Sequence, residues 1–258
     1  MAADLLAGAA IGLIGGIASG LTGTSPGGAL VVLSSALLGV DQHVAQGVSL
    51  IAQVPPTSLA GIARYRAGGA RAPLRWLVWM TLGFVAGGLA GAFAAAGVPD
   101  RALRWTYVGY LALLGLLLVL RRKEAGADRP ETSPEEASAA VLLAIGLVAG
   151  LSAGFLGIGG GLATTVGLTV FLRATQHQAQ MIGLALSLAP VNLPAAWVYY
   201  QAGWTASWPA LAGVVAGLAI GGDLGARLAN RLSAAQLRAI MLAMIGAMTA
   251  YMAFRAVS

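Results

Sequence analysis

Long apolar segments with almost no charge dominate the chain and restrict what it can fold into. They span roughly 4–21, 28–40, 44–63, 74–98, 103–120, 138–157, 161–172, 178–200, 206–226 and 235–254. Most reach the ~20 residues that cross a hydrocarbon layer of ~30 Å. Because every backbone polar group in lipid needs a partner within the protein, such segments form helices. We therefore predict an all-α polytopic membrane protein.

Composition excludes several other classes. Only 9% of the 258 residues are charged, whereas soluble domains carry about 25%. The chain has no Cys, which rules out disulfides, thiol chemistry and Cys-based zinc sites. The formal net charge of +6 is explained by basic cytoplasmic loops, so we expect the lipid bilayer and no nucleic acid as a partner. No cofactor and no metal site is predicted.

The sequence contains an internal repeat with a shift of 134 residues. A QHxAQ pattern begins at Gln42 and again at Gln176, and the glycine triplets 12, 16, 20 and 83, 87, 91 recur at 146, 150, 154 and 217, 221, 225. Between the halves lies a charged stretch with two prolines, which is typical of a solvated linker. We predict a first membrane repeat at 1–120, a cytoplasmic linker at 121–137 and a second membrane repeat at 138–258.

Loop charge predicts that the two repeats are inverted in the membrane. The Arg64–Arg75 loop carries four Arg, and the linker begins with Arg121, Arg122 and Lys123, so both should be cytoplasmic. The equivalent of that first loop, Gln201–Trp208, has no charge and should lie outside. Each repeat then begins with a helical hairpin, 4–40 or 138–173, followed by three spans. Both termini are expected outside.

The hairpin tips are glycine-rich, at Thr22–Gly28 and Gly157–Gly161. The arm after each tip has about 12 residues and reaches ~18 Å, so the tips should approach each other near the membrane midplane. Each tip opens a helix, whose N-terminus presents unpaired N–H groups and about half a positive charge. Two such ends could hold a small anion without a buried Arg or Lys. The alternative is that these glycines only permit turns and close packing.

The predicted substrate site combines the tips with two amides on the broken spans that follow them. Its residues are Thr22, Gly23, Thr24, Ser25, Gly27, Gly28, Gln53, Gly157, Gly159, Gly160, Gly161 and Asn192. Prolines at 55, 56 and 190 should break those spans. Polar residues there could instead join helices by hydrogen bonds.

A second set contains candidates for coupling or gating: Gln46, Gln180, His43, His177 and Asp223. The two histidines occupy equivalent hairpin exits, where a capping role is the alternative. Asp223 lies four residues before Arg227, so an ordinary ion pair is its alternative. Five tryptophans, at 76, 79, 105, 204 and 208, are expected as interfacial anchors.

The second tip carries a G-x-x-G-x-G-G-G motif, from Gly154 to Gly161, and Ala45–Leu50 matches A-x-x-x-S-L. In these motifs the chain resembles the sulfite exporter TauE/SafE family of membrane permeases. The first tip departs from the motif, with Ser25 and Pro26 in place of glycines. The resemblance implies transport of sulfite, sulfonates or related sulfur anions, and a bacterial inner membrane.

We therefore expect a secondary transporter or uniporter that moves a small sulfur-containing anion by alternating access, and not an enzyme. A homodimer is a candidate assembly. One alternative is an anion channel of the same architecture. Another is an intramembrane serine hydrolase, because residues 23–27 match G-x-S-x-G literally.

Overall fold

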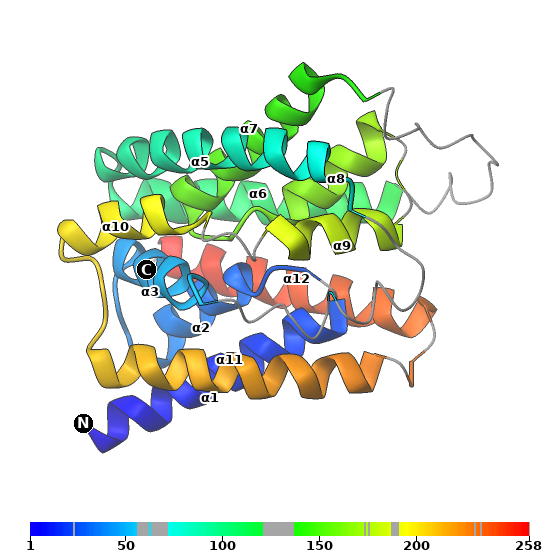
Figure 1. The fold of residues 1–258 in the computed structure, drawn as a ribbon. Helices are drawn as coiled ribbons and strands as arrows, with labels where there is room; N and C mark the ends of the chain where they lie inside the picture. The colour runs from blue at the N-terminus through cyan, green and yellow to red at the C-terminus, as the bar shows by residue number, and fades with distance from the viewer. Residues whose placement is uncertain are drawn as a thin grey trace.

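The structure, a computed structural model, describes residues 1–22, 24–55, 62, 72–120, 137–172, 174, 176–186, 191–229, 231–232 and 234–257. The predicted site residue Gly23, the loop arginines 64, 66 and 71, and linker residues 121–136 lie outside this part. All regular elements within it are helices (Figure 1): α1 (Ala2–Thr22), α2 (Gly27–Leu37), α3 (Gln42–Ala52), α5 (Leu74–Ala96), α6 (Asp100–Leu120), α7 (Ala139–Leu156), α8 (Gly161–Phe171), α9 (Gln176–Leu186), α10 (Leu193–Gln201), α11 (Trp208–Ala229) and α12 (Ala234–Val257).

Several helices have the length and apolar composition of membrane-spanning helices. In the described residues, α1, α5, α7, most of α11 and the Ala239–Val257 part of α12 are long and apolar enough to cross a membrane. Large apolar side chains are exposed along them, such as Leu6 at 70% and Phe93 at 65%, which suits contact with lipid rather than water. The predicted class, an all-α polytopic membrane protein, is confirmed.

Both predicted hairpins are present. A Cβ added to Gly15 of α1 would lie 2.9 Å from the Leu30 side chain of α2, so the two arms pack against each other on either side of the first tip. In the second half, a Cβ on Gly167 of α8 would lie 2.7 Å from the Ile145 side chain of α7. The short arms α2 and α8 have 11 residues each.

The long helices pack between the halves rather than within them. A Cβ on Gly12 of α1 would lie 2.0 Å from the Val214 carbonyl oxygen of α11, and one on Gly146 of α7 would lie 2.2 Å from that of Met80 in α5. The two contacts are equivalent in the repeat, because Gly146 lies 134 positions after Gly12 and Val214 lies 134 positions after Met80. Small residues let the backbones approach this closely. The repeat therefore extends from sequence to packing.

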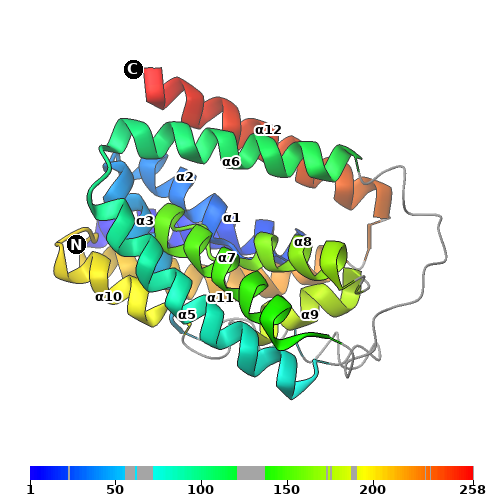
Figure 2. The same ribbon diagram turned by 90° about the horizontal axis from the view of Figure 1, so that it is seen from above.

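The remaining elements complete the two halves. Figure 2 shows α6 and α12, which are repeat equivalents, side by side along one side of the molecule. The predicted span 178–200 is broken, since α9 ends at Leu186 and α10 begins at Leu193. The predicted span 44–63 starts as α3, which already ends at Ala52. Both termini lie at the same end of the molecule (Figures 1 and 2).

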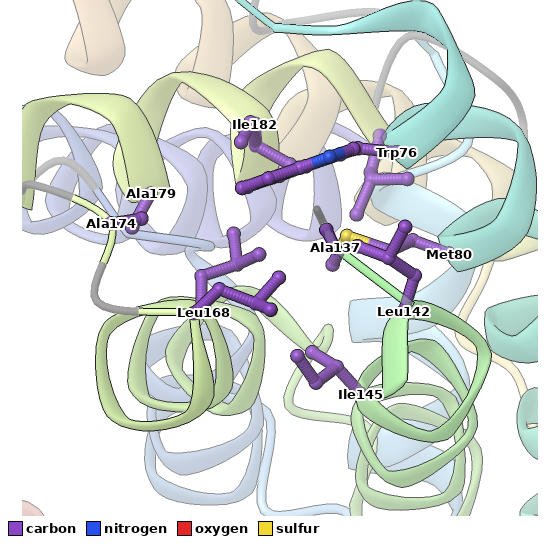
Figure 3. Packing of buried hydrophobic residues seen from close by; sticks show 11 residues of the cluster. Trp76, Met80, Ala137, Leu142, Ile145, Leu168, Ala174, Ala179 and Ile182 are labelled. Atoms are coloured by element: carbon purple, nitrogen blue, oxygen red, sulfur yellow. The ribbon is translucent and has the colours of Figure 1, made fainter. Parts of the chain in front are cut away.

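A buried cluster joins α5, α7, α8 and α9 (Figure 3). Trp76 lies at its centre with no exposed surface, packed with Leu142, Leu168 and Ile182. The expectation that Trp76 is an interfacial anchor is wrong. Charge and position in the sequence placed it near a membrane face, but its indole fills space between four helices.

The glycine contacts between helices should be essential for stability. We expect Gly150→Ala to lower the free energy of unfolding by about 1–3 kcal/mol, because overpacking forces helices apart. Its Cβ would lie 2.1 Å from the Phe84 carbonyl oxygen. Denaturation of the purified protein in mild detergent measures this change.

The matched control is Gly109→Ala on α6, where an added Cβ meets no atom within 4 Å. This variant should be neutral or slightly stabilised, since Ala is the better helix former. Equal stabilities for the two variants would contradict the packing account.

Candidate functional site

The two hairpin tips touch each other through their backbones. A Cβ on Gly27 would lie 2.1 Å from the Ile158 carbonyl oxygen, and one on Gly161 would lie 2.9 Å from the Ser25 nitrogen. No side chain could be accommodated at either glycine without moving the tips apart. The predicted approach of tips from opposite halves is thus observed.

The second tip needs glycine for its conformation as well as for space. Gly157 and Gly159 have φ values of +69° and +65°, in the left-handed region that side chains disfavour. Gly157 ends α7 and Gly160 caps the start of α8. In the first tip, Pro26 precedes α2 with φ −71°, which suits the start of a helix.

Polar side chains of α3 hold the tips together. Gln53 Nε2 donates to Ser49 Oγ at 3.0 Å, and Ser49 Oγ donates to the Gly157 carbonyl oxygen at 2.7 Å. Gln53 Oε1 accepts a hydrogen bond from Ser25 Oγ at 2.5 Å. This chain runs from the first tip through α3 to the second tip. It satisfies a carbonyl group that the end of α7 would otherwise leave unpaired.

Two tyrosines bind further tip carbonyls, and sequence reasoning missed both. Tyr107 of α6 donates to the Gly28 oxygen at 2.7 Å. Tyr199 of α10 lies 3.0 Å from the Gly154 oxygen and 2.8 Å from Gln46 Oε1. A single tyrosine in an apolar segment gives no periodic signal, so its partner could not be read from the sequence.

A cavity that we call the tip cavity lies at the N-terminus of α8. It is lined by Ser25, Gly159, Gly160, Gly161, Thr164, Asn192, Phe84, Gly183, Leu186 and Val191. Asn192 is 5% exposed, and its Oδ1 has no hydrogen-bond partner within the described part of the chain. It precedes α10 but makes no capping bond. Such an unpaired buried amide calls for a ligand.

Other predicted site residues line a second cavity on the far side of Ser25. Thr22, Thr24 and Gly28 belong to it. The Thr22 hydroxyl donates to the Ala18 oxygen at 2.9 Å and lies 2.8 Å from that of Thr24. The predicted set is therefore divided between two cavities that share Ser25, and Gln53 supports Ser25 between them.

The candidates for coupling or gating are dispersed. Gln180 of α9 donates to the Thr22 oxygen at 3.2 Å. A Cβ on Gly157 would lie 2.8 Å from Gln46, which places Gln46 against the second tip. Asp223 forms a 2.7 Å ion pair with Arg227 and is partly exposed. His177 lies in α9, and its side chain is outside the described structure.

His43 connects several elements at the end of the molecule where both termini lie. Its Nδ1 is 2.5 Å from Asp100 Oδ1, and its Nε2 is 3.0 Å from the Ala95 oxygen. The Trp204 ring lies 4.2 Å from the imidazole. The residue equivalent to Asp100 is Ala234, so the second half has no such carboxylate.

The site is electrically neutral in its side chains. None of the residues that line the tip cavity carries a charge. The described residues contain no group of three or more His, Asp or Glu side chains placed to hold a metal ion. What the tip cavity offers instead is a helix N-terminus, two hydroxyls and an amide, which together can accept a small anion.

The fold and this site define an integral membrane protein with a polar cavity enclosed by broken helices. The family model of the sulfite exporter TauE/SafE matches residues 8–252, and the chain belongs to this family. It is also similar to the "Probable membrane transporter protein YdhB" of Bacillus subtilis (strain 168), with 29% identity over 167 residues. That match covers 61% of this chain and 63% of the relative, less than two thirds of its length. Family and relative both indicate a membrane transporter.

The contact of α3 with the second tip should be important for stability. We expect Ser49→Ala to lower the free energy of unfolding by about 1–3 kcal/mol, because it leaves the buried Gly157 oxygen unpaired. Thr106→Ala is the control, since its exposed hydroxyl bonds only the Ala102 oxygen of its own helix. Thermal unfolding compares the two, and an unchanged Ser49→Ala melting temperature would show that this bond does not hold the tips.

Proposed function

We propose that the protein is a secondary transporter or uniporter that moves a small sulfur-containing anion, such as sulfite or a sulfonate, across the membrane. The observation that carries this proposal is Asn192. Its amide oxygen is buried and unpaired in the described structure, beside Ser25 and the N-terminus of α8. Membership of the TauE/SafE family supports the sulfur-anion class.

The anion would bind where the two tips meet. The first N–H groups of α8 lack acceptors within the helix and carry about half a positive charge in total. Ser25 contributes a hydroxyl that now donates to Gln53 and can turn to a ligand. An amide has both donors and an acceptor, so rotation of Asn192 presents its NH2 group to an anion. Uncharged donors of this kind bind an anion less tightly than a buried Arg or Lys would, so the anion can be released.

Transport would proceed by alternating exposure of this site, with the two repeats inverted relative to each other. In the described structure the tips are joined by hydrogen bonds of Ser25 and Ser49 and by close contacts at glycines. Movement of one hairpin against the other would exchange these contacts. In an inside-negative cell, export of one negative charge is favoured by ~2.3 kcal/mol per 100 mV. Export would need no coupled ion.

The surroundings of Ser25 argue against the serine hydrolase alternative. Its hydroxyl donates to the Gln53 amide oxygen, which is too weak a base to activate a nucleophile. His43 is occupied by Asp100 and the Ala95 oxygen. We therefore propose a transporter rather than an enzyme. We place it in a bacterial inner membrane, with the linker in the cytoplasm and both termini outside.

The proposal is tested by Asn192→Leu, which keeps the volume of the side chain but removes its polar atoms. Because Oδ1 has no partner to lose, the variant should be as stable as the wild type or more stable when no ligand is present. Its affinity for the transported anion should fall about 10-fold or more, the usual loss for a hydrogen bond to a charged group. Thermal shift with sulfite, methanesulfonate, sulfate, chloride and a neutral solute measures both effects.

Gln201→Leu, an exposed amide in the same helix, is the control and should bind like the wild type. A ligand at 100 times its dissociation constant adds about 2.7 kcal/mol to stability, which is easily detected. Undiminished binding by Asn192→Leu would contradict the tip cavity as the site. A wild type stabilised only by cations or neutral solutes would contradict an anion substrate.

A further inference from the structure

The second cavity beside Ser25 has two chemically different walls. One wall is polar and belongs to the first hairpin, with Ser19, Thr22, Thr24 and Ser25. The other is apolar and includes Met241, Met244 and Met248 of α12. Its remaining lining residues are Ala18, Pro26, Gly28, Ala29, Leu111, Ile158, Leu162 and Ile245. We call it the methionine cavity.

The three methionines form a stripe on one face of α12. Their spacing of three and four residues places them on successive turns above one another. Methionine side chains are flexible and polarisable, so they adapt to apolar ligands of different shape. At the near end of the stripe, a Cβ on Gly28 would lie 3.1 Å from Met248 Cε. The stripe therefore begins directly at the first turn of α2.

The polar wall can bind a charged group. Gly28 and Ala29 belong to the first turn of α2, which follows Pro26 and where N–H groups lack acceptors within the helix. The Thr22 hydroxyl donates to Ala18, so in the Thr22–Thr24 pair the donor is Thr24. Because that bond joins two hydroxyls, Thr24 can redirect its proton to a ligand at little cost. Ser25 connects this wall to the tip cavity.

From this juxtaposition we propose that the methionine cavity is a substrate subsite that takes the unbranched apolar chain of an organic anion whose head group is bound at the tips. The inference rests on the proposed anion site and narrows its substrate class to amphiphilic anions such as short alkylsulfonates. The head group contacts Ser25, which both cavities share, with Thr24 on the side of the carbon chain. The carbon chain lies along Met248 and Met244. An inorganic anion fills only the polar end.

The test is the affinity of the full-length protein in lipid nanodiscs for methane-, ethane-, propane- and 1-butanesulfonate, with empty nanodiscs subtracted. Burial of each added methylene should tighten binding about 4-fold, so butanesulfonate should bind roughly 60-fold more tightly than methanesulfonate. 1-Butanol, which has the chain but no head group, should not bind measurably.

Two variants test where the carbon chain of the sulfonate lies. Met244→Gln, nearly the same length but polar, should flatten the dependence of affinity on chain length. Met244→Leu, which keeps the wall apolar, should retain it. The readout is the gain in affinity per added methylene within each variant, so a general loss of stability does not imitate the effect.

The outcomes separate the two proposals. If the wild type binds neither a sulfonate nor sulfite, the proposed anion site is wrong and the subsite falls with it. Binding of sulfite without any sulfonate would overturn the subsite while the anion site stands. Equal binding of all four sulfonates would overturn the subsite while the anion site stands. If Met244→Gln kept the wild-type gain in affinity per added methylene, the carbon chain would lie elsewhere and the subsite would be overturned. Binding of 1-butanol as tight as that of butanesulfonate would also overturn it.

Discussion

Two helical hairpins turn in the interior of the protein, where Gly27, Gly157 and Gly160 are buried, and the structure is organised around the backbone groups that these turns leave unpaired. An unpaired carbonyl or N–H in lipid costs several kcal/mol. Ser49, Tyr107 and Tyr199 donate to carbonyl groups at or near the tips, and Gln53 fixes Ser49 and Ser25. Among the buried side-chain atoms that stay unpaired in the described structure is the amide oxygen of Asn192, which lies beside the beginning of α8. A polar site without charge follows from this incomplete pairing.

The glycine contacts make that arrangement feasible. Helix α1 packs on α11 and α7 on α5 through equivalent carbonyl contacts, so each half holds the other half's hairpin. The tips then meet as backbone against backbone, with a methionine-lined wall on one side and Asn192 on the other.

Much of this architecture could be predicted from the sequence, because it depends on periodic or repeated signals. Apolar segment lengths predicted the helices, and the repeated glycines predicted hairpins whose tips meet. Proline positions predicted the break between α9 and α10. The predicted site residues lie mostly at the tips, but those that line a cavity are divided between two. Gly27, Gln53 and Gly157 line neither cavity, and Gly23 lies outside the described residues.

Other features depend on contacts between distant segments, and single sequence positions do not encode those. Tyr199 binds Gly154 across 45 residues of sequence, and His43 meets Asp100 across 57. The burial of Trp76 likewise arises only when four helices surround it. The methionines of α12 did show a helical spacing, but only the fold places that face against the first tip.

The most direct measurement is the position of a bound anion. Crystals grown with selenite, a heavier analogue of sulfite, would give an anomalous signal at the anion. The account predicts a peak at the meeting point of the tips, within hydrogen-bond distance of Ser25 and near the first turn of α8. A peak only at basic residues outside the membrane segments, with none at the tips, would contradict it.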